Sequence, residues 1–219
     1  MTASGSFDAI ELPAFVWDEI GSDPEAVDQA KPDPSDAPGE LGLWVFILGD
    51  MTLFGLFFAV FLWENRRDRI AFAESAAHLH RSIGAVNTLV LLLSSYLVVV
   101  ALHAYRRGSM AHARVVLIGV LGCAMVFAAL KAVEYSAAIT SGHVVTSNMF
   151  WTFYFILTGI HLLHVLIGAI LVTLWCRKCT DGKAGTTATR FSEIAAVYWH
   201  MVDLLWVVIF TLLYVGCYS

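Results

Sequence analysis

The feature of this sequence that most limits its fold is a series of five long apolar stretches. Each has about 20 or more residues, and at a rise of about 1.5 Å per residue a helix of that length crosses the roughly 30 Å hydrocarbon core of a bilayer. Because lipid offers the backbone no hydrogen-bond partners, such segments must be helical. We therefore predict an all-α membrane protein, a bundle of five transmembrane helices over residues 41–63, 83–105, 115–139, 148–175 and 193–217.

The overall composition supports a membrane protein. Of the 219 residues, 58% are hydrophobic and only 14% are charged, whereas soluble domains carry roughly a quarter of charged residues. The basic residues form no continuous stripe or cluster that would indicate contact with nucleic acid. The composition therefore excludes an ordinary soluble protein and argues against a nucleic-acid-binding one.

The N-terminal region has a different character from the rest. Residues 1–40 hold ten of the eighteen acidic residues and one of the thirteen basic ones. Residues 21–39 are rich in Pro, Asp, Ser and Ala, which is typical of a solvated, disordered segment. Residues 7–20 mix large apolar side chains with acids, so they are either a docking segment or an adhesive disordered stretch. We predict an acidic, largely disordered tail (1–40) and a five-helix membrane domain (41–219).

The distribution of Lys and Arg predicts the orientation of the chain. Counted around the ends of the spans, eight basic residues lie on the side that holds the N-terminus and four on the other side. Cytoplasmic ends of membrane helices carry the excess of positive charge. We therefore expect a multi-pass protein of a bacterial inner membrane with a cytoplasmic N-terminus.

The first span contains one carboxylate and two glycines of interest. Asp50 lies about nine residues into the helix, roughly 14 Å from its start. A carboxylate at that depth must be protonated or partnered, and it could handle protons, contact a partner chain or form one interhelical hydrogen bond. Gly42 and Gly49 lie seven residues apart on one face, so we expect them to allow close helix contact there.

The second and third spans contain polar residues that suit helix–helix contacts. Asn87 and Ser94 share one face of the second span, and we expect them to form interhelical hydrogen bonds. Lys131 and Glu134 are three residues apart and so are neighbours on one face of the third span. They predict an internal ion pair, or alternatively a contact with a lipid headgroup or a partner.

The last two spans carry the remaining ionisable groups, which at membrane depth usually mark function. His161 and His164 are three residues apart, a spacing from which a helix could bind a metal or haem. The Glu-x-x-His pattern of di-iron bundles is absent, so we expect neighbouring carboxylates or hydroxyls to satisfy the histidines. Glu193 and His200 share a face, and Asp203 is placed to hydrogen-bond to His200 within the helix.

Several of these motifs, in order, resemble subunit III of the haem-copper oxidases. The run EIAAVYWHMVDLLWVVIFTLLY (193–214) resembles the last helix of that family, with its Glu-Ala-Ala, Tyr-Trp-His, Val-Asp and Trp positions. The run GIHLLHVLIGAILV (159–172) is similar to the family's Gly-Phe-His-Gly-Leu-His-Val motif. Glu134 and Tyr135 match the Glu-Tyr pair before the following turn. Residues 41–216, about four-fifths of the chain, look like helices III to VII of the family.

The chain departs from the family pattern in three places. The family's first two helices are missing, and the acidic tail stands in their place. Five-helix versions occur in quinol oxidases and in the nitric-oxide-reductase-associated branch, which the first span resembles most. Asp50 stands where cytochrome oxidases usually carry Glu, so a role in proton entry does not transfer directly. Ser192 separates Phe191 from Glu193, which are often adjacent in the family.

The resemblance implies a non-catalytic respiratory subunit with no haem, copper or other metal of its own. Such a subunit packs beside a catalytic subunit I-like chain, together with subunit II, holds phospholipids and supports complex stability and proton uptake in aerobic electron transport. We expect seven residues to form a polar interior that binds lipid or stabilises the bundle: Asp50, Glu134, His161, His164, Glu193, His200 and Asp203.

Other classes of protein remain as alternatives. The chain could be an accessory subunit of a nitric oxide reductase system. It could be a stand-alone membrane haem or metal protein that uses His161, His164 and His200. It could also be an assembly factor whose acidic tail recruits another subunit.

Overall fold

The computed structural model describes residues 41–180 and 186–218, so the tail and its docking segment 7–20 lie outside the described residues. Five of the helices are long and apolar enough to cross a membrane, which confirms the prediction of five spans. The elements are α3 (Leu41–Arg67), α4 (Arg69–Ala76), α5 (Arg81–Arg106), α6 (Met110–Thr140), α7 (Met149–Thr180), α8 (Thr186–Phe210), the π-helical turn η2 (Thr211–Val215) and the 3₁₀ turn η3 (Gly216–Tyr218).

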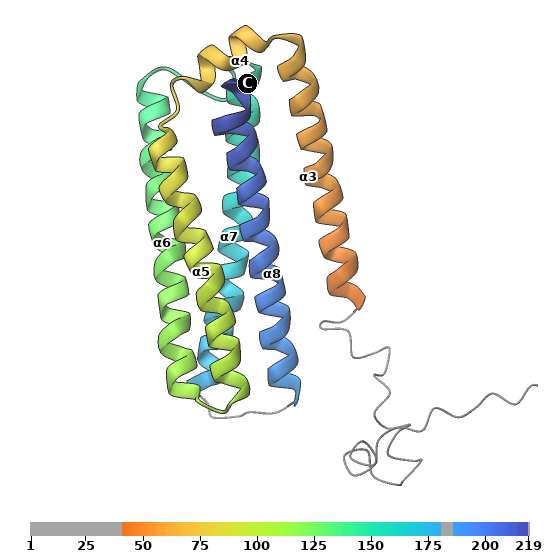
Figure 1. The fold of residues 1–219 in the computed structure, drawn as a ribbon, viewed down its shortest axis with the longest axis vertical. Helices are drawn as coiled ribbons and strands as arrows, with labels where there is room; N and C mark the ends of the chain where they lie inside the picture. The colour runs from red at the N-terminus through yellow and green to blue at the C-terminus, as the bar shows by residue number, and fades with distance from the viewer. Residues whose placement is uncertain (1–40, 181–185, 219) are drawn as a thin grey trace, which may run out of the picture. The chain divides into compact units, whose positions relative to one another are not determined.

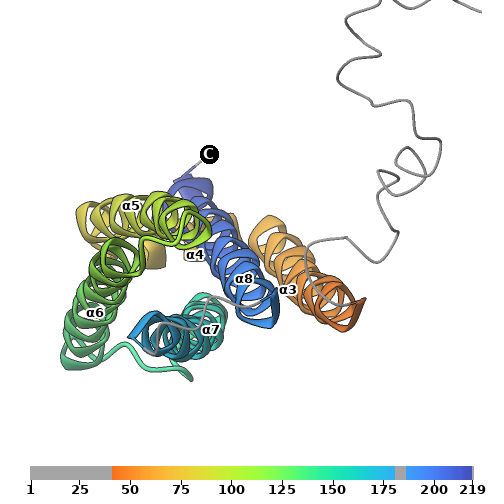
Figure 2. The same ribbon diagram turned by 90° about the horizontal axis from the view of Figure 1, so that it is seen from below.

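Four of the long helices form the body of the bundle. The helices α5, α6, α7 and α8 run alternately up and down and pack against their neighbours (Figure 1). Seen along the bundle, α3 lies at its edge next to α8 (Figure 2), and it also contacts α7 and α4. Four helices thus bury one another, whereas α3 has less contact with the rest.

Two tight turns connect the spans that pack most extensively. Gly108 follows α5 with a φ of 75°, and Gly142 follows α6 with a φ of 83°. This left-handed backbone conformation suits glycine, because it has no Cβ to clash. In both turns the backbone N–H one residue later returns to a carbonyl in the last turn of the helix, Ser109 to Ala104 and His143 to Ala138. The turns reverse the chain and make α5, α6 and α7 antiparallel neighbours.

The helix α4 was not predicted, because the sequence between the first two spans reads as a polar link. It begins after Asp68, whose carboxylate accepts a hydrogen bond from the Ala71 N–H at 3.2 Å and so caps the helix. Its buried Phe72 lies edge-on to Phe61 of α3 (5.5 Å between ring centroids) and to Phe150 of α7 (5.8 Å). The short helix therefore joins α3 to the bundle through aromatic packing.

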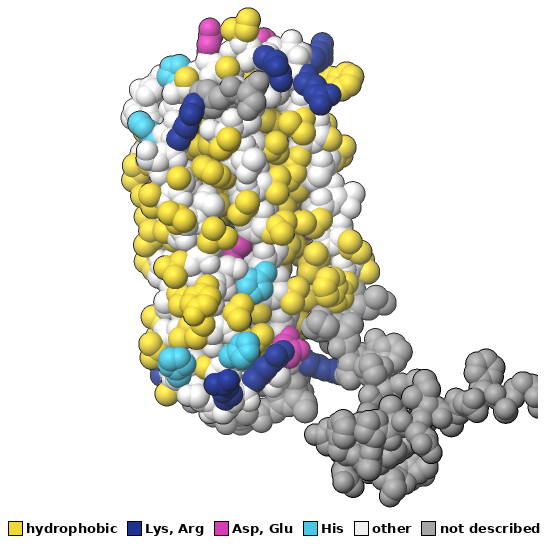
Figure 3. All heavy atoms as spheres, in the orientation of Figure 1, with side chains coloured by type: hydrophobic (Ala, Val, Ile, Leu, Met, Phe, Trp, Pro, Cys, Tyr) yellow, Lys and Arg dark blue, Asp and Glu magenta, His cyan; other side chains and the backbone are white. Residues whose placement is uncertain are grey.

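The outer surface fits a bilayer. Apolar side chains cover the middle of the molecule, and Lys and Arg side chains gather toward its two ends (Figure 3). On α3, the side chains of Val45, Leu48 and Trp63 are 63%, 64% and 66% exposed. Water would make such exposure costly, whereas lipid tails or apolar partner helices accept it.

Close helix contacts occur at different glycines from those predicted. A Cβ added at Gly42 or Gly49 would meet no other atom within 4 Å, so the prediction of close contact there is wrong within this chain. A Cβ at Gly84 would lie 2.9 Å from Phe210 and Tyr214, and one at Gly168 would lie 2.9 Å from Trp199. The glycines that allow close approach therefore face the aromatic side chains of α8 and η2.

The contact at Gly168 predicts a difference between two glycine substitutions. We expect Gly168→Ala to lower the thermal unfolding temperature in detergent, because overpacking against Trp199 costs about 1–3 kcal/mol. Gly122→Ala is the matched control, since no atom lies within 4 Å of that position, and alanine there favours the helix. An equal loss of stability in both variants would contradict the packing described here.

Candidate functional site

The most deeply buried polar group in the described structure is an ion pair on α6. The Lys131 Nζ donates a hydrogen bond to a Glu134 carboxylate oxygen at 2.7 Å, and the two side chains are 1% and 2% exposed. They lie three residues apart on one helix face, as the sequence predicted. The internal ion pair is confirmed.

Tyrosines from two other elements complete the hydrogen bonds of this pair. The Lys131 Nζ also contacts the hydroxyls of Tyr154 (3.1 Å) on α7 and Tyr214 (3.2 Å) in η2. The Tyr214 hydroxyl donates to both carboxylate oxygens of Glu134, at 2.7 and 2.8 Å. The Lys131 ammonium also lies 4.7 Å from the centre of the Tyr154 ring and 5.5 Å from that of Trp206, within cation–π range. The cluster joins α6, α7 and η2.

A small cavity reaches this cluster from the end of the bundle that holds α4. Its volume is about 70 Å³, and its lining includes Glu134 together with His78, His80 and His143. The His143 ring stacks on Trp151, with 4.6 Å between ring centroids. The imidazoles of His78 and His143 lie 4.9 Å apart. These loop histidines, which the sequence analysis left out, surround the mouth of the cavity.

A second polar contact ties α3 to the bundle. The His164 Nε2 lies 3.1 Å from an Asp50 carboxylate oxygen, and the two side chains are 10% and 8% exposed. The His164 Nδ1 lies 2.8 Å from the Ile160 carbonyl oxygen of its own helix. The Phe54 ring packs edge-on against the same imidazole at 5.5 Å. Of the readings left open for Asp50, the structure shows the interhelical hydrogen bond.

A row of hydrogen bonds joins α5 to α8. The indole N–H of Trp199 donates to the Ser94 hydroxyl at 3.0 Å, which confirms the interhelical role of Ser94. The His200 Nδ1 lies 2.6 Å from the Ser95 hydroxyl. The row continues with the indole N–H of Trp206, which donates to the Thr88 hydroxyl at 3.1 Å.

The row ends near the membrane surface with an ion pair. Arg106 of α5 and Glu193 of α8 lie 2.7 Å apart, with 52% and 21% of their side chains exposed. Glu193 and His200 both face α5, which confirms that they share one face of α8.

Three expectations about hydrogen bonds are wrong. His200 pairs with Ser95 rather than with Asp203, because Ser95 faces it from α5. Among the described residues, the carboxylate oxygens of Asp203 and the side-chain amide of Asn87 have no hydrogen-bond partner. The ring nitrogens of His161 likewise have none, so no carboxylate or hydroxyl satisfies that histidine.

The surroundings of His161 are aromatic rather than polar. The side chain is fully buried. Its ring lies 5.5 Å from that of Phe127 and 5.2 Å from that of Trp206, measured between centroids. His161 and His164 thus face different neighbours although they are three residues apart. Within residues 41–180 and 186–218, no three His, Cys, Asp or Glu side chains are grouped so that they could hold a metal ion.

The sequence analysis missed most of the partners in this site. Tyr154 and Tyr214 are 60 residues apart, and nothing in their local sequence marks them as ligands of one ion pair. Trp199 and Trp206 were noted as aromatic neighbours of the ionisable groups, but their indole N–H donors were not assigned partners. A buried Trp or Tyr usually satisfies its polar atom, and this rule could have flagged all four.

These features define a class of protein: a multi-pass α-helical membrane protein whose buried polar side chains mainly bond to one another across helices. Comparison with known proteins gives the family. Residues 37–218 match the family model of cytochrome c oxidase subunit III. The chain belongs to this family.

Named relatives agree with the family match. The chain is 28% identical over 176 residues to the probable quinol oxidase subunit 3 of Staphylococcus saprophyticus, covering 80% of this chain and 87% of that protein. It is 29% identical over 177 residues to the quinol oxidase subunit 3 of Bacillus subtilis (80% and 85%). It is 30% identical over 181 residues to the cytochrome c oxidase subunit 3 of Bacillus sp. strain PS3 (80% and 84%). The likeness to the nitric-oxide-reductase branch stays a prediction.

The buried ion pair predicts strong coupling between its two members. We expect Lys131→Met or Glu134→Gln alone to destabilise the protein by about 3–5 kcal/mol, because each leaves the other group unpaired in a dry interior. The double variant should lose clearly less than the sum of the two single losses. Thermal unfolding of all four proteins in one detergent measures this coupling, and strictly additive losses would count against a shared ion pair.

The contact between Asp50 and His164 predicts a local effect on α3. We expect Asp50→Ala to loosen α3 from α7, seen as faster proteolysis at the α3–α4 junction and a broader distance distribution between spin labels on α3 and α8. Thr52→Ala is the control, since the Thr52 hydroxyl bonds only to the Leu48 carbonyl of its own helix, at 2.7 Å. Identical behaviour of the two variants would show that the polar contact does not hold α3.

Proposed function

We propose that this chain is the subunit III of a respiratory haem-copper oxidase and acts without catalytic chemistry of its own. It would pack in the membrane beside a catalytic subunit I-like chain, together with subunit II. There it would stabilise the complex, hold phospholipid and support proton uptake during aerobic electron transport. The observation that carries the proposal is the family match over residues 37–218.

The geometry supports a structural role in the membrane. Lys131 and Glu134 are paired and surrounded by tyrosines, and His164 and His200 are engaged by Asp50 and Ser95. Polar groups occupied in this way stabilise a bundle, and none of these contacts leaves a nucleophile poised beside a base. The relatives are named for both quinol and cytochrome c oxidases, so we propose the oxidase class and not one electron donor.

The proposed support of proton uptake centres on α3. Asp50 occupies the position of the family's glutamate, and one of its carboxylate oxygens has no hydrogen-bond partner among the described residues. The other contacts His164. A partner chain packed against α3 would find a carboxylate held at a defined depth, which suits a supporting role in proton supply.

A stand-alone haem protein is favoured by no contact in the described part of the chain. His164 and His200 are engaged by different residues on different helices, and His161 faces aromatic rings. The nitric oxide reductase and assembly-factor alternatives remain open to the same experiment.

The test is purification of the complex through a tag on this chain. We expect Glu134→Ala or His164→Ala to reduce the recovery of the catalytic subunit and its turnover at least several-fold, with the haem spectrum of the recovered partner unchanged. Thr52→Ala should behave as wild type.

Three results would contradict the proposal. Loss of haem with normal assembly would assign these residues to the redox chemistry. A Soret band in the chain freed of partners would support a haem protein. Loss of association on deletion of residues 1–38, with a folded membrane domain, would support an assembly factor.

A further inference from the structure

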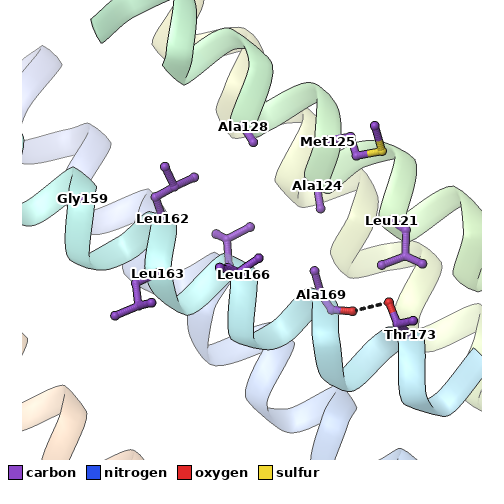
Figure 4. Close-up of a pocket in the computed structure, with 11 residues that line it drawn as sticks. Leu121, Ala124, Met125, Ala128, Gly159, Leu162, Leu163, Leu166, Ala169 and Thr173 are labelled. Carbon is purple, nitrogen blue, oxygen red and sulfur yellow. Dashed lines mark hydrogen bonds between the residues drawn. The ribbon is translucent and has the colours of Figure 1, made fainter.

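An apolar groove runs along the outer surface between α6 and α7, away from the polar contacts described above. Its volume is about 670 Å³. Small residues on both helices make it, with Ala124 and Ala128 on α6 facing Gly159 and Ala169 on α7 (Figure 4). Because these side chains are short, the two helices leave room between the larger residues on either side.

The walls of the groove offer nothing to a polar ligand. Thr173 carries the one side-chain hydroxyl among the lining residues, and it donates to the Ala169 carbonyl of its own helix at 2.7 Å. The lining of α7 extends from Gly159 to Thr173, about 21 Å at helical rise. One leaflet is roughly half of a ~30 Å hydrocarbon core. The groove is therefore long enough for a lipid acyl chain.

Two arginines continue the faces that line the groove. Arg114 precedes Leu121 by seven residues on α6, and Arg177 follows Thr173 by four residues on α7. These spacings return to the same helix face. Both side chains are exposed. The charge of Arg114 acts on the Cys179 thiol near the end of α7, so the ends of the two helices lie close together.

The two arginines have no carboxylate partner in the part of the chain that the structure describes. The ion pairs found there involve Arg67, Arg106, Lys131 and His164. Two unpaired guanidinium groups at one end of an apolar groove form a site that is complementary to a phosphate attached to a hydrocarbon chain. They also lie on the predicted cytoplasmic side, where bilayers carry anionic lipid.

We propose that the groove between α6 and α7 binds one acyl chain of an anionic phospholipid, whose phosphate contacts Arg114 and Arg177. This inference deepens the lipid-holding part of the proposed function and rests on it. It places a lipid at a site made by neither the buried ion pair nor the contact between Asp50 and His164. A partner helix in the groove is the competing occupant, and the experiment below separates the two.

The test is native mass spectrometry of the protein purified in mild detergent with whatever chains accompany it. Phosphatidylglycerol or phosphatidylcholine is added at matched concentrations. We expect wild type to retain phosphatidylglycerol in preference. Arg114→Gln with Arg177→Gln should weaken phosphatidylglycerol binding by about fivefold per arginine and remove the preference. Arg66→Gln with Arg69→Gln, at the opposite end of the spans, is the matched control and should keep it.

A second variant tests the groove itself. Ala124→Leu with Ala128→Leu fills it and should reduce the binding of both lipids. Unchanged preference in the Arg114 and Arg177 variant, or equal loss in the control, would overturn the phosphate contact. Lipid binding that survives the filled groove, with loss of a copurifying chain, would assign the groove to a partner helix. Copurified haem is read in the same samples, so failure of the lipid site is distinguishable from failure of the proposed function.

Discussion

A charge inside a bilayer is tolerated when the protein itself supplies its hydrogen bonds, and the rest of this structure depends on that constraint. Lys131 and Glu134 meet it with each other and with Tyr154 and Tyr214. The cluster can form only when α6, α7 and η2 are brought together. Satisfying one ion pair therefore fixes the relative positions of three elements.

The same constraint explains the less strongly packed part of the molecule. The helix α3 makes fewer contacts than the other spans, and its main polar contact joins Asp50 to His164. Phe72 of α4 adds an aromatic contact at the other end of the helix. An edge helix held at two points keeps most of its apolar surface exposed, and that surface suits lipid or a neighbouring subunit.

The sequence predicted much of the fold and less of the site. Runs of about 20 apolar residues identify spans because hydrocarbon allows little else, and the i,i+3 spacing of Lys131 and Glu134 predicts their ion pair. Periodicity within one helix could not show that Ser95 would take His200 from Asp203. It also could not show that Gly84 and Gly168, rather than Gly42 and Gly49, would face aromatic rings. These outcomes depend on the rotation of one helix against another.

The sequence by itself determined that the chain crosses a membrane five times, which ionisable side chains lie inside it and which family the motifs resemble. Local composition and spacing decide those properties. The tertiary structure alone decided which side chains meet, from the tyrosines around Lys131 to the groove between α6 and α7. Contacts between helices depend on how residues far apart in the chain pack, and no pattern within one span contains that information.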